Sequence, residues 1–112
     1  MLREGFYRVQ FSAADCGVGI VAVESGHVRG GDGQYLYSGK IDIDGQAVST
    51  RLKIKSIDPQ APSVFGTLGD FALPLAGQVT EAGFALAGQP VESGTQAISV
   101  IGTFLCTLDL DT

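Results

Sequence analysis

The sequence contains little of what catalytic and metal-binding sites require. Its 112 residues include no tryptophan, two cysteines and one histidine, His27. Metal sites draw several ligands from histidine, cysteine and carboxylate side chains, so we predict no metal and no other cofactor. Nucleophilic catalysis also lacks its parts, because no serine lies in a G-x-S-x-G motif and neither cysteine has a nearby basic partner. We therefore expect a protein that is not an enzyme.

Positive charge is also scarce. Seven lysines and arginines stand against twelve aspartates and glutamates, for a net charge of −5. Recognition of a phosphate backbone depends on clustered lysine and arginine, so the composition argues against direct binding of nucleic acid. The one local basic run, Arg51, Lys53 and Lys55, alternates along a predicted strand and so occupies one face of it. We interpret that run as a solvated strand face.

Long hydrophobic runs are absent too. The first residues, MLREGFYRVQF, lack the apolar stretch of a secretory signal, and no apolar run reaches the length of a membrane span. We expect a cytoplasmic protein without membrane association. A disulfide between Cys16 and Cys106 is geometrically possible where the first and last strands of a barrel meet. Two reduced, unrelated thiols are the expected state in the cytoplasm.

What the sequence does contain is glycine and short alternating runs. Sixteen glycines separate apolar segments in a chain that is 45% hydrophobic. Tyr7, Val9 and Phe11 alternate with polar residues, which is the period of a half-buried strand. Similar runs recur about every 8–12 residues, without an amphipathic helix. We expect residues 1–112 to form a single all-β domain, an antiparallel up-and-down barrel of about eight strands.

The clearest hairpin lies between Tyr35 and Lys55. Asp44-Gly45 separates two alternating runs and fits the two-residue type I′ turn, which needs positive φ at both positions. The glycines at 30–33 suggest a phosphate loop, but no GK[ST] motif and no helix follow them. We interpret them as residues of turns and barrel corners.

Residues 58–69 interrupt the strand pattern. Two prolines prevent regular pairing there, and we expect one short helical turn near residues 62–67. Beyond this segment, Pro74 predicts an edge strand or a bulge. The last strand is expected to continue to Leu108, with Cys106 on its inward face.

An eight-stranded barrel is either filled by its own side chains or holds one small ligand. The bulky residues predicted to line its lumen are Tyr7, Phe11, Tyr35, Tyr37, Leu52, Phe71, Phe84 and Phe104. On the same faces, Gly39 and Gly102 are expected to leave room for a ligand. On the outer face of the last strand, Ile101 and Leu105 predict a second buried surface, a dimer contact.

The chain resembles the GrlR-like family through short segments in the same order and spacing. These segments are Gly5 to Tyr7 leading to Phe11, Cys16 to Ile20, Gly26, Gly30 to Asp32, Tyr37 to Gly39 and Pro62 to Val64. They lie in about the first two thirds of the chain. The founding member of the family is a negative regulator of type III secretion that binds its transcriptional activator. The resemblance implies a small lipocalin-like barrel that forms a homodimer.

The resemblance also implies an acidic contact with the partner. In the family, a run of acidic residues in an exposed turn is held to bind the activator. The corresponding turn here carries only Asp42 and Asp44, on either side of Ile43. These two are the candidate partner-binding residues. From the residues alone, carboxylates at a hairpin tip are expected to be solvated.

Two functions remain open. The first is a non-catalytic regulatory module that binds a protein such as a transcriptional activator. The alternative is a lipocalin-like carrier or sensor of a small apolar ligand in the barrel lumen. An open lumen would favour the carrier, and a filled lumen would favour the protein-binding module.

Overall fold

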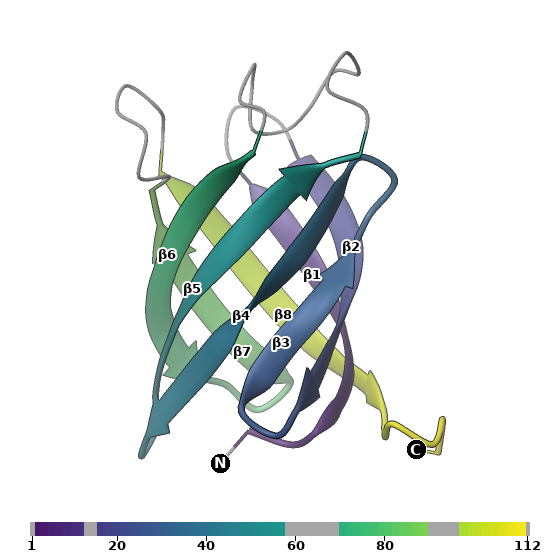
Figure 1. The fold of residues 1–112 in the computed structure, drawn as a ribbon. Helices are drawn as coiled ribbons and strands as arrows, with labels where there is room; N and C mark the ends of the chain where they lie inside the picture. The colour runs from purple at the N-terminus through teal and green to yellow at the C-terminus, as the bar shows by residue number, and fades with distance from the viewer. Residues whose placement is uncertain (1, 13–15, 58–69, 90–96, 112) are drawn as a thin grey trace.

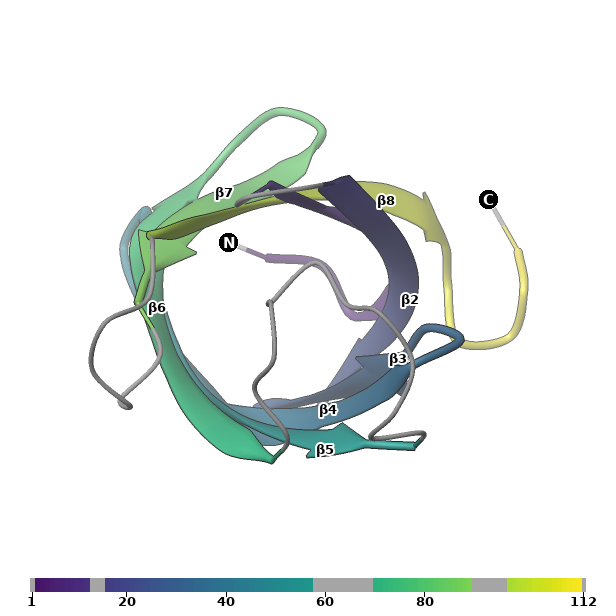
Figure 2. The same cartoon turned by 90° about the horizontal axis from the view of Figure 1, so that it is seen from above.

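Eight antiparallel strands form one closed barrel. The computed structural model describes residues 2–12, 16–57, 70–89 and 97–111. The strands are β1 (Gly5–Ser12), β2 (Cys16–Glu24), β3 (His27–Gly31), β4 (Tyr35–Asp44), β5 (Ala47–Ser56), β6 (Phe71–Val79), β7 (Gly83–Gly88) and β8 (Ile98–Cys106). Each strand pairs with the next along the chain, and β8 closes the ring against β1 (Figures 1 and 2). The predicted all-β barrel is confirmed. The helical turn expected near residues 62–67 lies outside the described residues.

Alternating side chains explain why these segments close around one core. From Tyr7 to Ser12, buried and exposed residues of β1 alternate, and β5 alternates in the same way. This is the period of two that a strand imposes. Burial of one large apolar side chain contributes about 1.5–3 kcal/mol, and a slip of one residue would expose the whole inward row. The alternation predicted for both strands is confirmed.

Two hairpin turns differ in which loop residues have positive φ. In the β2–β3 turn, Ser25 and Gly26 have φ angles of 53° and 76°, which is the type I′ pattern. In the β4–β5 hairpin, Asp44 pairs with Ala47, and of the two residues between them only Gly45 has a positive φ, 63°. That is the type II′ pattern. The type I′ turn predicted at Asp44-Gly45 is therefore wrong by one residue, because Asp44 stays paired in β4.

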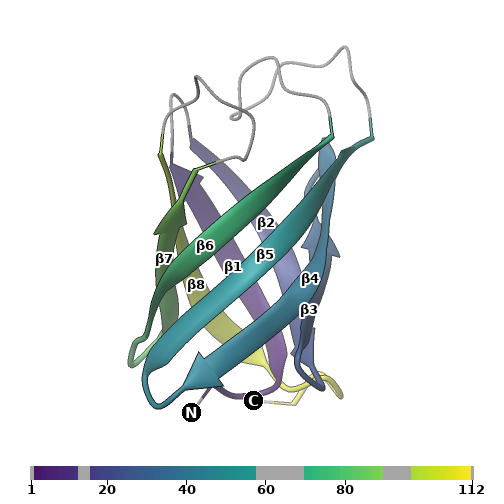
Figure 3. The same ribbon diagram turned by 60° about the vertical axis from the view of Figure 1, so that its left-hand side comes forward.

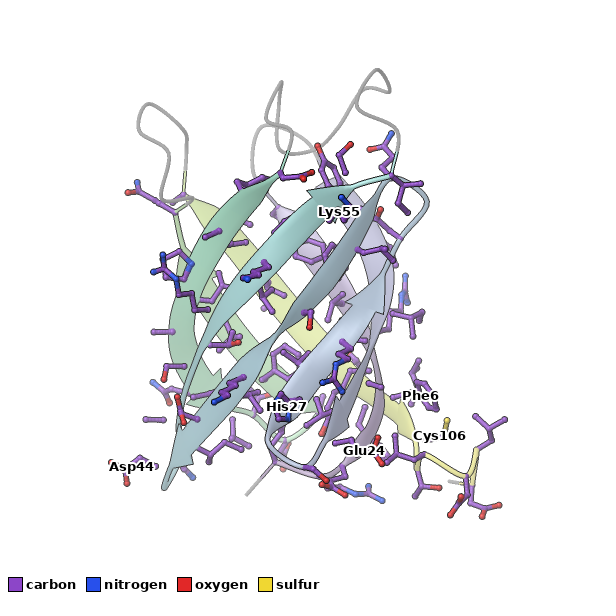
Figure 4. All side chains as sticks on the ribbon, viewed as in Figure 1. Phe6, Glu24, His27, Asp44, Lys55 and Cys106 are labelled. Carbon is purple, nitrogen blue, oxygen red and sulfur yellow. The ribbon has the colours of Figure 1, made fainter. Side chains whose placement is uncertain are left out.

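β8 is shorter than expected and contains a bulge. Tyr7 pairs with Phe104 while its neighbour Phe6 pairs with Cys106, so Leu105 is an extra residue on β8. The bulge moves Cys106 out of the inward row, and Figure 4 shows Phe6 and Cys106 outside the barrel wall. The strand ends at Cys106. The predictions that it continues to Leu108 and that Cys106 faces inward are wrong.

The two cysteines lie near opposite ends of β1. Cys16 pairs with Ser12, and Cys106 pairs with Phe6. These partners are separated by about 20 Å along the strand. A disulfide requires Cα atoms within about 7 Å, so the two cysteines cannot form one within the chain. Cys106 is a free thiol.

Pro74 lies within the closed ring. It pairs with Arg51 of β5 without a shift in register, so it marks neither an edge strand nor a bulge, and that prediction is corrected. On its other side, β7 pairs with β6 only from Leu75 to Val79. Proline has no N–H to donate to a ladder, and its place just past the end of this ladder accommodates the missing donor.

The N-terminal segment covers part of one end of the barrel. The β2–β3 and β4–β5 turns and both chain ends lie at this end, which we call the turn end (Figures 1 and 3). Leu2 is buried there. The Tyr7 hydroxyl donates to the Arg3 carbonyl at 2.6 Å, and the Glu4 carboxylate accepts the Ser25 N–H at 2.6 Å. These bonds hold residues 2–4 across the opening.

Candidate functional site

The candidate ligand cavity is a packed core. Of the eight predicted lining residues, seven are buried and Phe104 is partly buried against them. The ring centroids of Tyr7 and Phe84 are 5.2 Å apart, those of Tyr7 and Phe104 are 5.4 Å apart, and those of Phe11 and Tyr37 are 5.2 Å apart. These are contact distances for aromatic rings. The structure thus brings the predicted residues together, and they pack against one another.

The space expected beside two glycines is filled. A Cβ at Gly102 would lie 2.2 Å from the Phe84 ring, and a Cβ at Gly39 would lie 2.5 Å from the Arg51 carbonyl oxygen. The expectation that these glycines leave room for a ligand is wrong, because the Phe84 ring and the β5 backbone occupy that space.

A small cavity remains among the inward side chains. Its volume is about 30 Å³, which is close to the share of liquid volume of one water molecule. Its lining residues are Val9, Phe11, Val21, Val28, Tyr37, Ile41, Thr50, Leu52, Leu75, Phe84, Leu86 and Val100. An apolar ligand would have to displace several of these side chains.

A part-buried hydrogen-bond network joins the start of β4 to its interior. The Asp32 carboxylate accepts the N–H groups of Gln34 at 2.7 Å and of Tyr35 at 2.8 Å, and it also accepts the Tyr37 hydroxyl. Burial, followed by the bond to Asp32, raises the pKa of Tyr37. This network was not predicted from the sequence. An aspartate that bonds to N–H groups two residues on is a recognised turn signal and could have revealed it.

A cation lies over the aromatic core at the turn end. The Arg3 guanidinium carbon lies 3.9 Å from the Phe104 ring centroid, within the range of a cation–π contact. Because Phe104 contacts Tyr7, this contact joins the N-terminal segment to the packed rings. It was not predicted, because Arg3 precedes the first strand pattern.

The tip of the β4–β5 hairpin carries both predicted partner-binding residues. Asp42 and Asp44 are exposed, and alternate residues of a strand project to the same side. Asp44 stands at the tip, away from the barrel (Figure 4). Between them, Ile43 is 38% exposed and lines a cleft of about 700 Å³ at the turn end. The other lining residues are Leu2, Glu4, Val23, Gly26, Ile41 and Gly45.

This cleft was missed from the sequence. Three segments that are distant in the sequence form it, namely the residues before β1, the β2–β3 turn and the β4–β5 hairpin. The hairpin tip therefore presents carboxylates on one side and an apolar side chain on the other.

The predicted dimer-contact residues are exposed on the outer wall. Ile101 and Leu105 are 48% and 42% exposed. Gln10 of β1 pairs with both Ile101 and Val18, so it lies between two exposed aliphatic side chains. The outer wall therefore carries exposed aliphatic side chains on β8 and on β2, with the polar face of β1 between them.

The basic run of β5 is exposed, as its alternation predicted. Arg51, Lys53 and Lys55 all lie on the outer face. The Lys55 ammonium lies 3.7 Å from the Asp70 carboxylate. An exposed ion pair of this kind contributes at most about 1 kcal/mol.

The described residues contain no arrangement for metal chemistry. His27 is half-buried beside a turn, where its Nδ1–H donates to the Ser25 carbonyl at 3.1 Å. Across residues 2–12, 16–57, 70–89 and 97–111, no three histidine, cysteine or carboxylate side chains are placed to hold a metal ion. No helix in those ranges is long and apolar enough to cross a membrane.

Comparison with known proteins adds no identity. No family model matches the sequence, and no curated protein matches it. We therefore argue the function from the geometry of the described residues.

Proposed function

We propose that the protein is a non-catalytic protein-binding module that acts through its outer surface. A packed lumen supports this proposal over the alternative of a carrier. The cavity among the inward side chains is about 30 Å³, whereas sites for small ligands usually measure about 300–1,000 Å³. The packing of the described lumen therefore favours binding groups on the outer wall or at the barrel ends.

The hairpin tip has the composition of a protein contact. Protein interfaces combine an apolar centre with a polar rim. Here the exposed Ile43 lines the cleft of about 700 Å³, and the exposed Asp42 and Asp44 lie on the other side of the strand. The resemblance to GrlR-like regulators, which hold an activator through an acidic turn, supports the same role for this tip. The proposed partner is a regulatory protein such as a transcriptional activator, and the proposed place of action is the cytoplasm.

A capture experiment tests this role. The protein is immobilised, and partners from its own cell are identified for the wild type and for the double variant Asp42→Asn/Asp44→Asn. We expect the variant to lose most of the capture, because both carboxylates of the contact become neutral. The matched control is Asp109→Asn/Asp111→Asn, which neutralises two exposed carboxylates of the same spacing and should capture as the wild type does. Equal capture by all three proteins would remove the hairpin tip from the proposal.

We also propose that the protein forms a homodimer through Ile101 and Leu105 on the outer face of β8. Contiguous exposed apolar surface is typical of association sites, and Ile101 and Leu105 supply it. Light scattering should give twice the chain mass of 11.6 kDa, and Ile101→Ser/Leu105→Ser should reduce it to one chain. Leu36→Ser, at an equally exposed aliphatic on β4, should leave the dimer intact. A monomeric wild type would contradict the proposal.

A further inference from the structure

Positive charge is concentrated on one part of the outer wall. The chain has seven lysines and arginines and a net charge of −5. Five of the seven occupy exposed positions on three adjacent strands: Arg29 on β3, Lys40 on β4, and Arg51, Lys53 and Lys55 on β5. We call the outer faces of these three strands the basic wall. Figure 4 shows His27 and Lys55 on it.

The strand register places cations close to one another on the basic wall. Ser38 pairs with both Arg29 and Lys53, so it lies between two cations. Lys40 and Arg51 lie on adjacent strands and line one groove together with Lys53. Like charges held close together repel one another. Within the described part of the chain, the ion pair of this wall is Lys55–Asp70, and the other four cations have no carboxylate at ion-pair distance. This arrangement favours an anionic partner.

A groove lies between these side chains. Its volume is about 540 Å³. It is lined by His27, Ser38, Gly39, Lys40, Asp42, Ser49, Thr50, Arg51 and Lys53. The Thr50 hydroxyl is already engaged, because it donates to the Lys40 carbonyl at 2.6 Å. The serine hydroxyls and the cationic groups remain to bind a ligand.

The spacing of the cations fits an extended acidic segment. Alternate residues of a strand are about 6.6 Å apart, so Arg51 and Lys53 present charges at the spacing of alternate carboxylates in an extended peptide. Asp42 lies in the groove toward the hairpin tip and would repel such carboxylates there. They are therefore expected over Arg51 and Lys53.

Single-stranded nucleic acid fits the groove less well. Its binding sites combine basic residues with aromatic side chains on which the bases stack, and the described residues that line this groove include no phenylalanine or tyrosine. A long polyanion would also meet the net charge of −5 on the rest of the molecule.

We infer that the groove of the basic wall binds an acidic protein segment in extended conformation, with Lys40, Arg51 and Lys53 paired to its carboxylates. The inference rests on the proposed protein-binding function and adds a second contact of opposite charge to the acidic hairpin tip. A partner that engages both would carry basic or apolar groups for the tip and carboxylates for the groove.

A defined peptide tests the groove. The probe is a capped, fluorescent peptide of alternating glutamate and serine, and its binding is measured by fluorescence anisotropy at low and at physiological ionic strength. We expect binding that weakens with salt, and a loss of affinity of about fivefold or more in Arg51→Glu, because each exposed ion pair accounts for up to about a fivefold effect. Arg51→Gln, which adds no repulsion, should lose less. Circular dichroism checks that each variant is folded.

The matched control is Lys55→Glu. Lys55 is exposed on β5 and is not among the described residues that line the groove, so its reversal changes the net charge by the same amount outside the groove. We expect it to change affinity by less than about twofold. Equal losses from Arg51→Glu and Lys55→Glu would overturn the inference, since net charge alone would then explain the binding. Undetectable binding of the peptide by the wild type would also overturn it.

Two further results would assign the groove to another occupant and so overturn the inference. One is tighter binding of a single-stranded RNA of equal charge under the same conditions. The other is a change from dimer to monomer caused by Arg51→Glu, which would make the groove a contact between copies of this chain. The proposed function fails separately, through the capture experiment with the Asp42 and Asp44 variants.

Discussion

Phe84 occupies the space that a side chain at position 102 would need. The ring is buried, and its centroid lies 5.2 Å from that of Tyr7. It therefore cannot move aside without disturbing its neighbours. The absence of a side chain at Gly102 allows the Phe84 ring of β7 to lie against β8, and this contact fills part of the lumen.

Replacement of Gly102 by alanine should destabilise the protein. The new Cβ would lie 2.2 Å from the Phe84 ring, and overpacking of a core costs about 1–3 kcal/mol. Urea unfolding measures the loss as a lower midpoint with an unchanged slope. Gly33→Ala is the control, because a Cβ there meets nothing within 4 Å and should shift stability by less than about 0.5 kcal/mol. Equal midpoints for the two variants would contradict the packing described here.

Tyr37 makes the stability of the protein depend on pH in the alkaline range. Burial first, and then the bond to Asp32, raise its pKa above the ordinary value of about 10. The folded state therefore keeps the proton at a pH where the unfolded chain loses it. This stabilisation is complete below pH 10, and it falls by up to about 1.4 kcal/mol per unit as pH rises above 10. Burial also raises the pKa of Tyr7 in the same direction.

The variant Tyr37→Phe should isolate the contribution of the Tyr37 hydroxyl to the pH dependence of stability. At neutral pH it should be less stable by about 1–2 kcal/mol, because Asp32 loses one hydrogen-bond donor. Above pH 10 its stability should fall less steeply than that of the wild type, so that the two curves converge. Unfolding by urea at a series of pH values gives both curves. Parallel curves would show that Tyr37 does not keep its proton in the folded state.

At the residue scale, the sequence predicted which side chains of a strand point to the core better than it predicted how those side chains pack. Alternation correctly assigned Tyr7, Val9 and Phe11 to the core, because a strand repeats every two residues. It could not show that the Phe84 ring lies against Gly102, since that contact depends on the register between β7 and β8. The bulge at Leu105 was hidden for the same reason, and it reversed the side assigned to Cys106.

Turn residues set the geometry of the hairpins at the scale of elements. The sequence identified the β4–β5 hairpin through its glycine but not the pairing of Asp44 with Ala47. The predicted type I′ turn and the observed type II′ turn both use glycine, but the position of the glycine within the turn differs by one residue. Both turn types leave the Asp44 side chain exposed, so its exposure was predicted correctly.

Ser25 offers a test of this reading of the turns. Its φ of 53° is one that serine adopts at a cost of about 1 kcal/mol and that asparagine tolerates better. We expect Ser25→Asn to raise the melting temperature by roughly 4 °C. Ser49→Asn places the same change on an extended, exposed strand position and should not raise it. A rise of equal size in both variants would contradict the assigned turn.

At the scale of the whole molecule, regular strand spacing predicted the closed barrel, since closure leaves no edge strand exposed. The distribution of charge over the barrel could not be read in the same way. Arg29, Lys40 and Arg51 come from three strands, and the pairing of those strands gathers them on one wall. The cleft at the turn end was hidden too, because its walls come from distant segments.

The described lumen is filled by side chains, and we propose that the protein acts through its surface. Native mass spectrometry of the protein purified from its own cell is the sharpest test of this proposal. We expect a mass of 11.6 kDa or a whole multiple of it, with no small-molecule adduct. A stoichiometric apolar adduct that is released on unfolding would contradict it.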